Sequence, residues 1–325
     1  MAKFLIIQTS FIGDVILATP VIEKLHRQYP GARIDFMLRR GNEELLTGHP
    51  SLQKIYIWDK KRNKYSNLFA ILKDVRKVRY DYIINLQRFF STGLFTVLAR
   101  SKTSIGFSKN PLSFLFDKKV LHIFRDGMHE VERNIALIED ITDAGFQRPV
   151  LYPSLNDFNR VKEYKNKPYV CFAPASVWFT KQLPVGQWVE LGKSITTNYV
   201  LIFLGASGDI ELCNQIINSI GKDNTVNLCG KLTMLQSAAL MKDAKMNYVN
   251  DSAPLHLASS INAPVTAFFC STIPGFGFGP LSDQSAIAQI GYELKCRPCS
   301  LHGKKICPEG HFKCGNDIKV NDFLV

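Results

Sequence analysis

The sequence predicts an α/β protein built from two Rossmann-like domains that face each other across a cleft. Three observations support this prediction: the chain has 325 residues, short apolar runs alternate with longer amphipathic ones, and the alternation pauses once near the middle. At ~150 residues per domain, this length suggests two domains, each large enough for its own core. Alternating strands and helices favour parallel sheets with helices on both faces.

The first half of the chain begins with an apolar run and continues with helical periodicity. Residues 4–8 are apolar almost throughout, which predicts a buried strand. Residues 14–29 carry apolar side chains at the spacing of one helix face, which predicts a helix directly after it. The further elements expected here are strands at residues 33–38, 54–58 and 82–86 and a helix at residues 68–78.

The alternation pauses at residues 148–168, where Pro149, Pro153 and Pro168 are separated by polar residues. We interpret this stretch as the connection between two domains, with one short helix in it. Beyond it, strands are expected at residues 169–172, 200–204, 225–228, 247–249 and 265–269, and helices at residues 185–195, 209–220, 234–241 and 253–261. The expected domains are therefore residues 1–155 and residues 156–325.

The composition is that of a globular enzyme, but the charge is unevenly distributed. Hydrophobic residues make up 46% and charged residues 21% of the chain, which excludes a disordered protein. The formal net charge is +12, yet residues 1–125 hold 22 Lys and Arg against 9 Asp and Glu, whereas the remainder holds 18 against 19. A basic first half indicates an anionic partner, namely nucleic acid, a membrane surface or an acidic substrate. A basic surface with no partner is the alternative.

The chain lacks the features of a membrane or secreted protein. No run approaches the ~18 apolar residues of a membrane span, and the apolar start is too short for a signal peptide. We therefore expect a cytoplasmic protein, in which the eight cysteines would be mostly reduced.

The turn after the first strand carries a candidate general base. Gly13 permits close approach of the backbone, and Asp14 follows it in the first helical turn. A carboxylate at the carboxyl end of a strand can take a proton from a bound substrate. Alternatively, Asp14 only complements the helix dipole. No G-x-G-x-x-G or phosphate-loop motif is present.

Three strand-to-helix turns of the second domain carry residues suited to a nucleotide. Lys181 lies in the loop before Pro184, where a cation suits a diphosphate, although a single lysine is more often plain surface. Asp209 follows Gly205 and suits ribose hydroxyls, or else caps its helix. Asp251 or Ser252 is expected to cap the next helix, with Pro254 in its first turn, leaving free N–H groups for phosphate. His256 falls in that helix, where a structural role is more common.

Four cysteines near the end of the chain form a further candidate site. Cys296, Cys299, Cys307 and Cys314 lie close together in sequence, with His302 and His311 between them. Such a group could hold a structural zinc ion. The spacing is not that of a standard finger or ribbon, so disulfides or reduced thiols remain alternatives.

The order and spacing of these motifs across nearly the whole chain resemble glycosyltransferase family 9, the bacterial heptosyltransferases of the lipopolysaccharide inner core. That family carries an IGD turn, a PG-x-K-x-WP segment, a G-x-x-x-[DE] turn, an NDSGPMHLA helix start and, in many members, a C-x-P-C tail. The corresponding segments are residues 11–14, 173–184, 205–209, 250–258 and 296–299, and residues 104–107 and 129–134 are also similar. Ala175 and Ala253 replace glycines, and Gln182-Leu183 replaces a basic residue and a tryptophan, which removes an aromatic wall.

The resemblance implies a GT-B fold and an inverting transfer from ADP-L-glycero-D-manno-heptose to Kdo or heptose of the inner core. It implies that Asp14 is the general base, and that Lys181 and the helix N-terminus near Ser252 stabilise the leaving diphosphate. Asp209 would bind the ribose, and Asp251 the heptose hydroxyls or the loop around them. No metal is required, because the lysine and the helix dipole supply positive charge. The donor-binding residues expected on this basis are Gly13, Ser176, Lys181, Gly205, Asp209, Asp251, Ser252, Ala253 and His256.

The resemblance also offers a partner for the basic first half. The N-terminal domain of such an enzyme binds the acceptor, which here carries Kdo carboxylates and lipid A phosphates. We therefore expect a cytoplasmic protein that is peripheral on the inner face of the inner membrane. The acceptor-binding candidates are Arg39, Arg62 and Arg88, and further cations to consider are Arg40, Lys60, Lys61 and Lys64.

Two other functions are consistent with parts of the sequence. The differences from the family motifs favour, as one alternative, a family-9 enzyme with another nucleotide sugar or another surface-glycan acceptor. The basic first half alone would suit a nucleic-acid-binding protein. The chain lacks an RNP-type aromatic motif, a helix-turn-helix and a C₂H₂ finger, so no nucleic-acid partner is expected.

Overall fold

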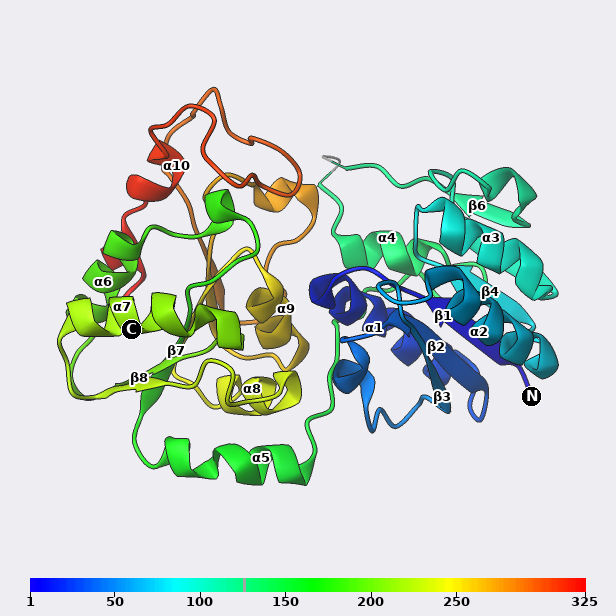
Figure 1. Ribbon diagram of the computed structural model, residues 1–325, viewed down its shortest axis with the longest axis horizontal. Helices are drawn as coiled ribbons and strands as arrows, with labels where there is room; N and C mark the ends of the chain where they lie inside the picture. Colours follow the sequence, from blue (N-terminus) through cyan, green and yellow to red (C-terminus); the bar gives the residue numbers. More distant parts are fainter. Residues whose placement is uncertain (125–126) are drawn as a thin grey trace. The chain divides into compact units, whose positions relative to one another are not determined.

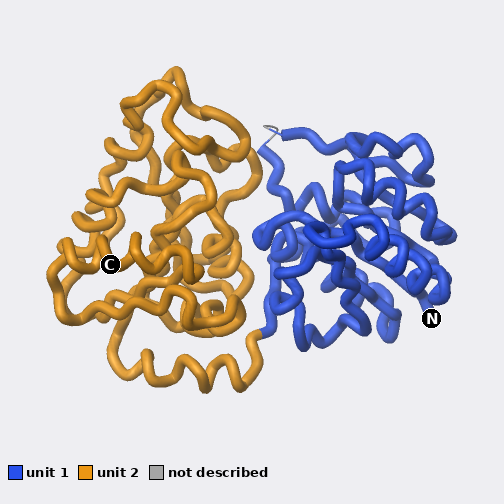
Figure 2. Tube along the Cα trace, viewed as in Figure 1, with its two compact units in different colours: residues 1–152 blue, residues 153–325 orange. Residues whose placement is uncertain are grey.

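The structure, a computed structural model, describes residues 1–124 and 127–325 and contains two compact units. Unit 1 is Met1–Tyr152 and unit 2 is Pro153–Val325, coloured separately in Figure 2. The division falls three residues before the boundary that the sequence predicts. No helix in either described range is long and apolar enough to cross a membrane.

Unit 1 is a six-stranded parallel sheet in the order β3-β2-β1-β4-β5-β6. Its strands are β1 (Lys3–Ile7), β2 (Arg33–Arg39), β3 (Lys54–Trp58), β4 (Tyr82–Asn85), β5 (Thr103–Phe107) and β6 (Lys118–Val120). Its helices are α1 (Ile12–Gln28), α2 (Lys64–Val78), α3 (Phe90–Ala99) and α4 (Glu130–Ala136). α2 packs against α3 and α1 packs against α4, as Figure 1 shows. β1 is apolar from Phe4 to Ile7 and fully buried, because helices cover both faces of a parallel sheet.

Unit 2 repeats this architecture in the order β12-β11-β10-β7-β8-β9. Its strands are β7 (Tyr169–Ala173), β8 (Val200–Phe203), β9 (Thr225–Asn227), β10 (Asn247–Asn250), β11 (Val265–Phe268) and β12 (Ser285–Ala288). Its helices are α5 (Leu155–Val161), α6 (Val185–Ser194), α7 (Ile210–Ile220), α8 (Met234–Met241), α9 (Ala253–Ser260) and α10 (Lys313–Asn316). Phe172 lies at the centre of an aromatic core, with ring centroids 5.1–5.4 Å from Trp188, Phe203 and Tyr248. These contacts join α6 to three neighbouring strands.

Each strand and long helix that the sequence predicts is present, with ends shifted by a few residues. The prediction misses β5, β6, α3 and α4 in unit 1 and β12 and α10 in unit 2. β6 and β12 are short edge strands with exposed polar residues such as Lys119 and Ser285, so neither shows a buried apolar run. α1 begins at Ile12, two residues earlier than predicted, which places Asp14 at its third position.

Candidate functional site

Each unit has one point where its strand order reverses, and the candidate residues gather around these two points. In unit 2 the reversal lies between β7 and β10, and in unit 1 it lies between β1 and β4. Ligands of open α/β sheets bind outside the carboxyl ends of the strands at such a point. Lys181 follows β7, Asp251 follows β10, and Asp14 follows β1.

Lys181 and Asp251 form a direct ion pair in unit 2. The Lys181 Nζ atom lies 2.8 Å from Asp251 Oδ2, and both side chains are largely buried. Asp251 Oδ2 also accepts a 2.6 Å hydrogen bond from the Thr272 hydroxyl, which follows β11. The pair therefore draws on the ends of three adjacent strands. It holds a cation at the carboxyl ends of the unit 2 strands, where an anionic ligand is expected to bind.

The loop that carries Lys181 is fixed by the buried side chain of Asn250. Asn250 Oδ1 accepts the N–H of Leu183 at 2.9 Å, and its Nδ2 donates to the carbonyl of Pro174 at 2.7 Å. A second bridge runs from Gln182 Nε2 to the carbonyl of Ser176 at 2.6 Å. Both ends of the loop are thus tied down, so Ser176 contributes a backbone carbonyl to the loop's own structure.

Arg297, from the segment near the C-terminus, holds the backbone beyond β11. Its guanidinium donates to the carbonyls of Cys270 at 2.7 Å, Thr272 at 2.8 Å and Phe269 at 3.1 Å. Because Thr272 in turn bonds Asp251, Arg297 positions the partner of Lys181 without touching it. No motif in the sequence marks Thr272, and only the place of Arg297 inside the C-x-x-C motif signals that residue.

The same segment also packs on the Lys181 loop itself. The N–H of Lys304 donates to the Thr180 hydroxyl at 2.7 Å, and the N–H of Thr180 donates back to the Lys304 carbonyl at 3.1 Å. Gly303 has φ +81°, and a Cβ there would lie 2.9 Å from Lys181 Cγ. Only glycine permits this approach, so the C-terminal segment forms part of the wall behind Lys181.

The N-terminus of α9 presents a positive helix end at the same sheet edge. Ser252 is its N-cap residue and makes no side-chain capping bond, and Pro254 lies in the first turn. Ala253 occupies the first helical position and is partly exposed. The unpaired N–H groups and the helix dipole favour an anion here. His256 lies one turn further and is buried, with its ring 6.4 Å from that of Phe278.

Gly205 and Asp209 form the turn after β8, which neighbours β7. Asp209 Oδ2 accepts the N–H of Ala206 at 2.7 Å, so the carboxylate closes its own turn, as in the capping alternative. A Cβ on Gly205 would lie 2.9 Å from Asp209 Cβ and 3.0 Å from Cys229 Sγ. Glycine is therefore needed for this turn to form.

Asp14, in unit 1, has a carboxyl group tuned towards neutral pH. Its Oδ2 accepts the N–H of Phe11 at 3.1 Å, as expected of an acidic residue in a first helical turn, and Gly13 precedes it in α1. Burial and the charge of Glu130 together raise the pKa of Asp14 to about 6, against the opposing effects of the Phe11 hydrogen bond, Arg88 and Arg39. A base with such a pKa is mostly ionised at pH 7 and still accepts a proton readily.

Glu130 belongs to a buried polar cluster that no sequence motif assigns to the site. Its Oε1 lies 3.1 Å from His122 Nε2, and its Oε2 accepts from Arg133 Nη1 at 3.1 Å. These partners fix Glu130 within reach of the Asp14 charge. Glu130 and Arg133 fall within the 129–134 segment, which the sequence marks only as a family-like stretch, whereas His122 lies outside it.

The basic candidates of unit 1 differ in whether they act on the charge of Asp14. Arg39 stacks over Phe11 at 4.7 Å, and Arg39 and Arg88 both act on the Asp14 charge. Arg62 is exposed and is not among the groups that shift Asp14. Lys60 donates to the Thr9 carbonyl at 2.7 Å, and burial lowers its pKa to about 8.

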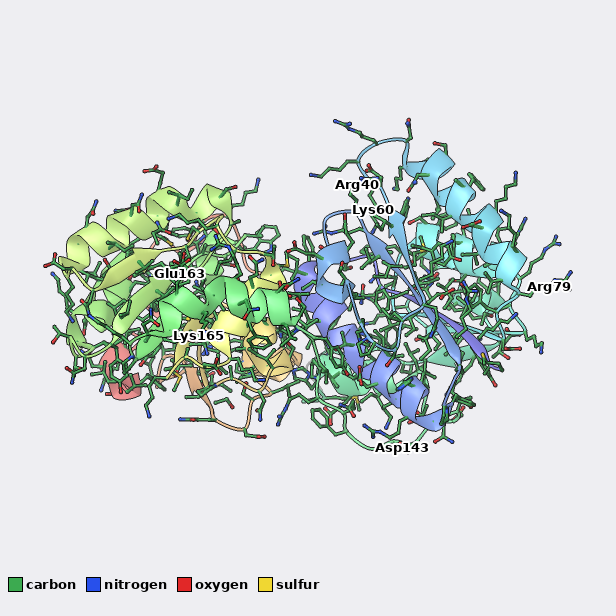
Figure 3. The ribbon with its side chains drawn as sticks, turned by 90° about the horizontal axis from the view of Figure 1, so that it is seen from below. Arg40, Lys60, Arg79, Asp143, Glu163 and Lys165 are labelled. Atoms are coloured by element: carbon green, nitrogen blue, oxygen red, sulfur yellow. The ribbon has the colours of Figure 1, made fainter. Side chains whose placement is uncertain are left out.

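The remaining cations lie around the ends of β2 and β3. Figure 3 shows Arg40 beside Lys60, and Arg40 pairs with Asp59 at 2.9 Å. Lys61 and Lys64 are exposed. Together with Arg39, these side chains make this end of the unit 1 sheet strongly basic.

Two expectations about unit 2 need correction. The residues described contain no group of three or more His, Cys, Asp or Glu arranged to hold a metal, so zinc at Cys296, Cys299, Cys307 and Cys314 lacks support. The thiols are free, and burial and the neighbouring thiols raise the pKa of Cys314 to about 12. The position at which the family motif has tryptophan, and where the loss of an aromatic wall was expected, faces inward. Leu183 is buried in the hydrophobic core, because Asn250 pulls its backbone against β10.

Two doubly wound units, with a lysine and a helix N-terminus at the reversal point of one and a carboxylate of raised pKa at that of the other, match the arrangement expected of a GT-B glycosyltransferase. Residues 68–309 match the family described as "Glycosyltransferase family 9 (heptosyltransferase)". This match spans well over half of the chain, so the protein belongs to glycosyltransferase family 9 and is a glycosyltransferase.

Individual relatives and structures agree with this assignment. The chain is 24% identical to lipopolysaccharide heptosyltransferase 1 of Pseudomonas aeruginosa, over 94% of this chain and 87% of the relative. It is 25% identical to lipopolysaccharide heptosyltransferase 2 of Escherichia coli K12, over 89% and 88%. Among structures, ADP-heptose lps heptosyltransferase II of E. coli aligns with a TM-score of 0.77 at 24% identity, over 97% of both chains. A family 9 glycosyl transferase from Veillonella parvula aligns with a TM-score of 0.80 at 20% identity, over 88% of this chain and 85% of that chain.

Proposed function

We propose that this glycosyltransferase moves heptose, with inversion, from ADP-L-glycero-D-manno-heptose to Kdo or heptose of the lipopolysaccharide inner core. The observation that carries the proposal is the Lys181–Asp251 pair beside the α9 N-terminus, at the strand reversal of unit 2. The names of the relatives, which are lipopolysaccharide heptosyltransferases 1 and 2, favour this donor and this acceptor.

In this proposal, unit 2 binds the donor and stabilises its leaving group. The diphosphate lies against Lys181 Nζ and the N–H groups at the start of α9. As the bond from the sugar to the diphosphate breaks, negative charge grows on ADP, and preorganised positive groups lower the energy of that state. Asp251 keeps Lys181 aimed at the sheet edge. Asp209 offers its carboxylate to the ribose hydroxyls, and His256 supports α9 from within unit 2.

Asp14 acts as the general base on the acceptor. Its carboxylate takes the proton of the acceptor hydroxyl while that oxygen bonds to the anomeric carbon, from the side opposite the departing ADP. The configuration at that carbon is therefore inverted. The raised pKa of Asp14 suits this role, because the protonated form is accessible near neutral pH.

The acceptor is anionic and belongs to a membrane. Arg39 and Arg88, which lie near enough to Asp14 to shift its pKa, are proposed to bind acceptor carboxylates, with Arg62 further out. Kdo carboxylates and lipid A phosphates match the basic character of residues 1–125. The proposed location is the inner face of the inner membrane, as a peripheral protein on the cytoplasmic side.

A transfer assay with purified components tests the proposal. ADP-heptose and a Kdo-bearing acceptor should yield ADP and a heptosylated product whose new bond has the inverted configuration, read by NMR. A second candidate, another nucleotide sugar or surface-glycan acceptor, is favoured by the extra methyl groups of Ala175 and Ala253 at positions where family motifs have glycine. Turnover with a UDP- or GDP-sugar and none with ADP-heptose would replace the first candidate by the second.

A further inference from the structure

Unit 1 exposes an unusual number of large apolar side chains around the loops after β4, β5 and β6. Each of these side chains is more than half exposed. The six residues, named here the apolar patch, are Phe89, Phe90, Phe114, Leu115, Leu121 and Ile123. Exposed apolar side chains are ordinary when scattered, but a contiguous group of them marks an interaction surface.

Hydrogen bonds tie the three loops of the patch into one surface. Asn110, after β5, donates from Nδ2 to the carbonyls of Gln87 and Phe89 at 3.0 and 3.1 Å. The N–H of Ser108 donates to the carbonyl of Val120 at the end of β6, at 2.8 Å. The patch is therefore held by the sheet rather than spread over independent loops.

The edge position of β6 leaves the segment after it without a neighbouring strand. β6 is the last strand of the sheet, and beyond it Leu121 and Ile123 are exposed on either side of buried His122. This alternation places both apolar side chains on the outer face. Lys118 and Lys119 protect the β6 edge itself with charge, so the exposed apolar side chains belong to the segment that follows this strand.

Cations outnumber carboxylates around the patch, where the exposed Asp117 follows Leu115 and Phe116. Residues 82–116 contain no Asp or Glu but contain Arg88, Arg100, Lys102 and Lys109. Arg88 and Lys109 lie 5.0 and 5.1 Å from the ring of Phe124, which follows Ile123 in the chain. Apolar side chains framed by cations are typical of surfaces that insert into the headgroup region of anionic lipid.

We infer that the apolar patch docks unit 1 on an anionic lipid bilayer, with its side chains at the boundary between headgroups and acyl chains. Arg88 connects this surface to the reaction, because it acts on the Asp14 charge. It lies three residues beyond β4, the strand that neighbours β1. Docking would thus bring a lipid-linked acceptor to Asp14. This last step rests on the proposed function, whereas docking itself does not.

Vesicle flotation of the full chain tests the docking without donor or acceptor. The probes are vesicles of phosphatidylethanolamine with phosphatidylglycerol, and vesicles of phosphatidylcholine alone. One variant is F89S/F90S, in which serine at the N-cap position of α3 also favours the helix. The other is L121S/I123S. The matched control is L155S/V177S, which removes two exposed apolar side chains from unit 2.

The protein should float with the anionic vesicles and much less with phosphatidylcholine. Each patch variant should lose ~10-fold or more in partitioning, because two large side chains no longer leave water, while the control stays like the parent. Equal floating of parent and patch variants, or an equal loss in the control, would overturn the inference. So would a parent that forms a dimer which the patch variants break, with vesicle binding unchanged.

A kinetic comparison separates docking from the proposed reaction. With a lipid-linked acceptor in vesicles, the patch variants should show a raised KM and an unchanged kcat. With a deacylated, water-soluble acceptor they should match the parent. Loss of activity on the soluble acceptor would place these residues in the acceptor site instead and overturn the docking role. Vesicle binding by a parent without heptosyltransferase activity would refute the proposed function and leave the docking intact.

Discussion

The raised pKa of Asp14 predicts how kcat/KM depends on pH. With a pKa of about 6, Asp14 is roughly nine-tenths ionised at pH 7 and roughly half ionised at pH 6. Because the base acts in its ionised form, kcat/KM should rise with pH and level off above about pH 6. An unshifted aspartate would place this rise near its ordinary value of 3.8.

Substitution tests the chemical role and its electrostatic setting separately. Asp14→Asn keeps the shape and removes the base, so kcat should fall roughly 10²–10⁴-fold, with ADP affinity unchanged because Lys181 and the α9 N-terminus, which are proposed to hold the diphosphate, belong to unit 2. Asparagine carries no charge that burial opposes, so thermal stability at pH 8 should not fall. Near-normal turnover would refute the assignment of Asp14 as the base.

Glu130→Gln should shift the rising limb of the profile to lower pH. The charge of Glu130 raises the pKa of Asp14, so removing that charge lowers the pKa while glutamine keeps polar partners for His122. The matched control is Glu132→Gln, an exposed carboxylate of the same helix that is not among the groups that shift Asp14. The reasoning fails if the limb stays in place in Glu130→Gln or moves equally in Glu132→Gln.

Three further substitutions test how the site of unit 2 is built. Arg297→Lys cannot keep three carbonyl contacts, so calorimetric ADP affinity should fall several-fold; unchanged affinity would remove its positioning role. Asn250→Ala leaves two buried backbone groups unpaired and should cost ~2–5 kcal/mol of unfolding free energy, measured by urea denaturation; a loss below about 1 kcal/mol would contradict the hydrogen bonds described. Gly205→Ala forces a methyl group against Asp209 Cβ and should weaken the binding of ADP more than the binding of inorganic phosphate. Equal weakening of both would show that this turn does not contact the nucleoside.

The architecture could be predicted because most strands of both sheets are buried on two faces. Continuous apolar runs such as residues 4–7 and 169–173 leave little alternative to a central parallel strand. The two edge strands that were missed, β6 and β12, have no such run. β6 consists of Lys118, Lys119 and Val120, and it is held as an edge strand by its pairing with β5, which the sequence does not display.

Only those features of the site that depend on a residue's position directly after a strand could be predicted. The positions of Lys181 and Asp251 at strand ends follow from the alternation, but their ion pair follows from the order of β7 and β10, which places distant segments together. Likewise, the roles of Thr272 and Arg297 depend on the packing of the C-terminal segment against the backbone beyond β11. The influence of Glu130 on Asp14 depends on α4 packing against α1, and no local pattern reveals it.

The most direct test of the donor site is calorimetric binding of ADP, UDP and GDP to the purified protein and to its Lys181→Ala variant. Lys193→Ala, an exposed lysine at the far end of α6, is the matched control. The account predicts a preference for ADP that Lys181→Ala weakens ~10-fold or more and that Lys193→Ala leaves unchanged. No binding of ADP, a preference for UDP or GDP, or equal binding by Lys181→Ala would contradict it.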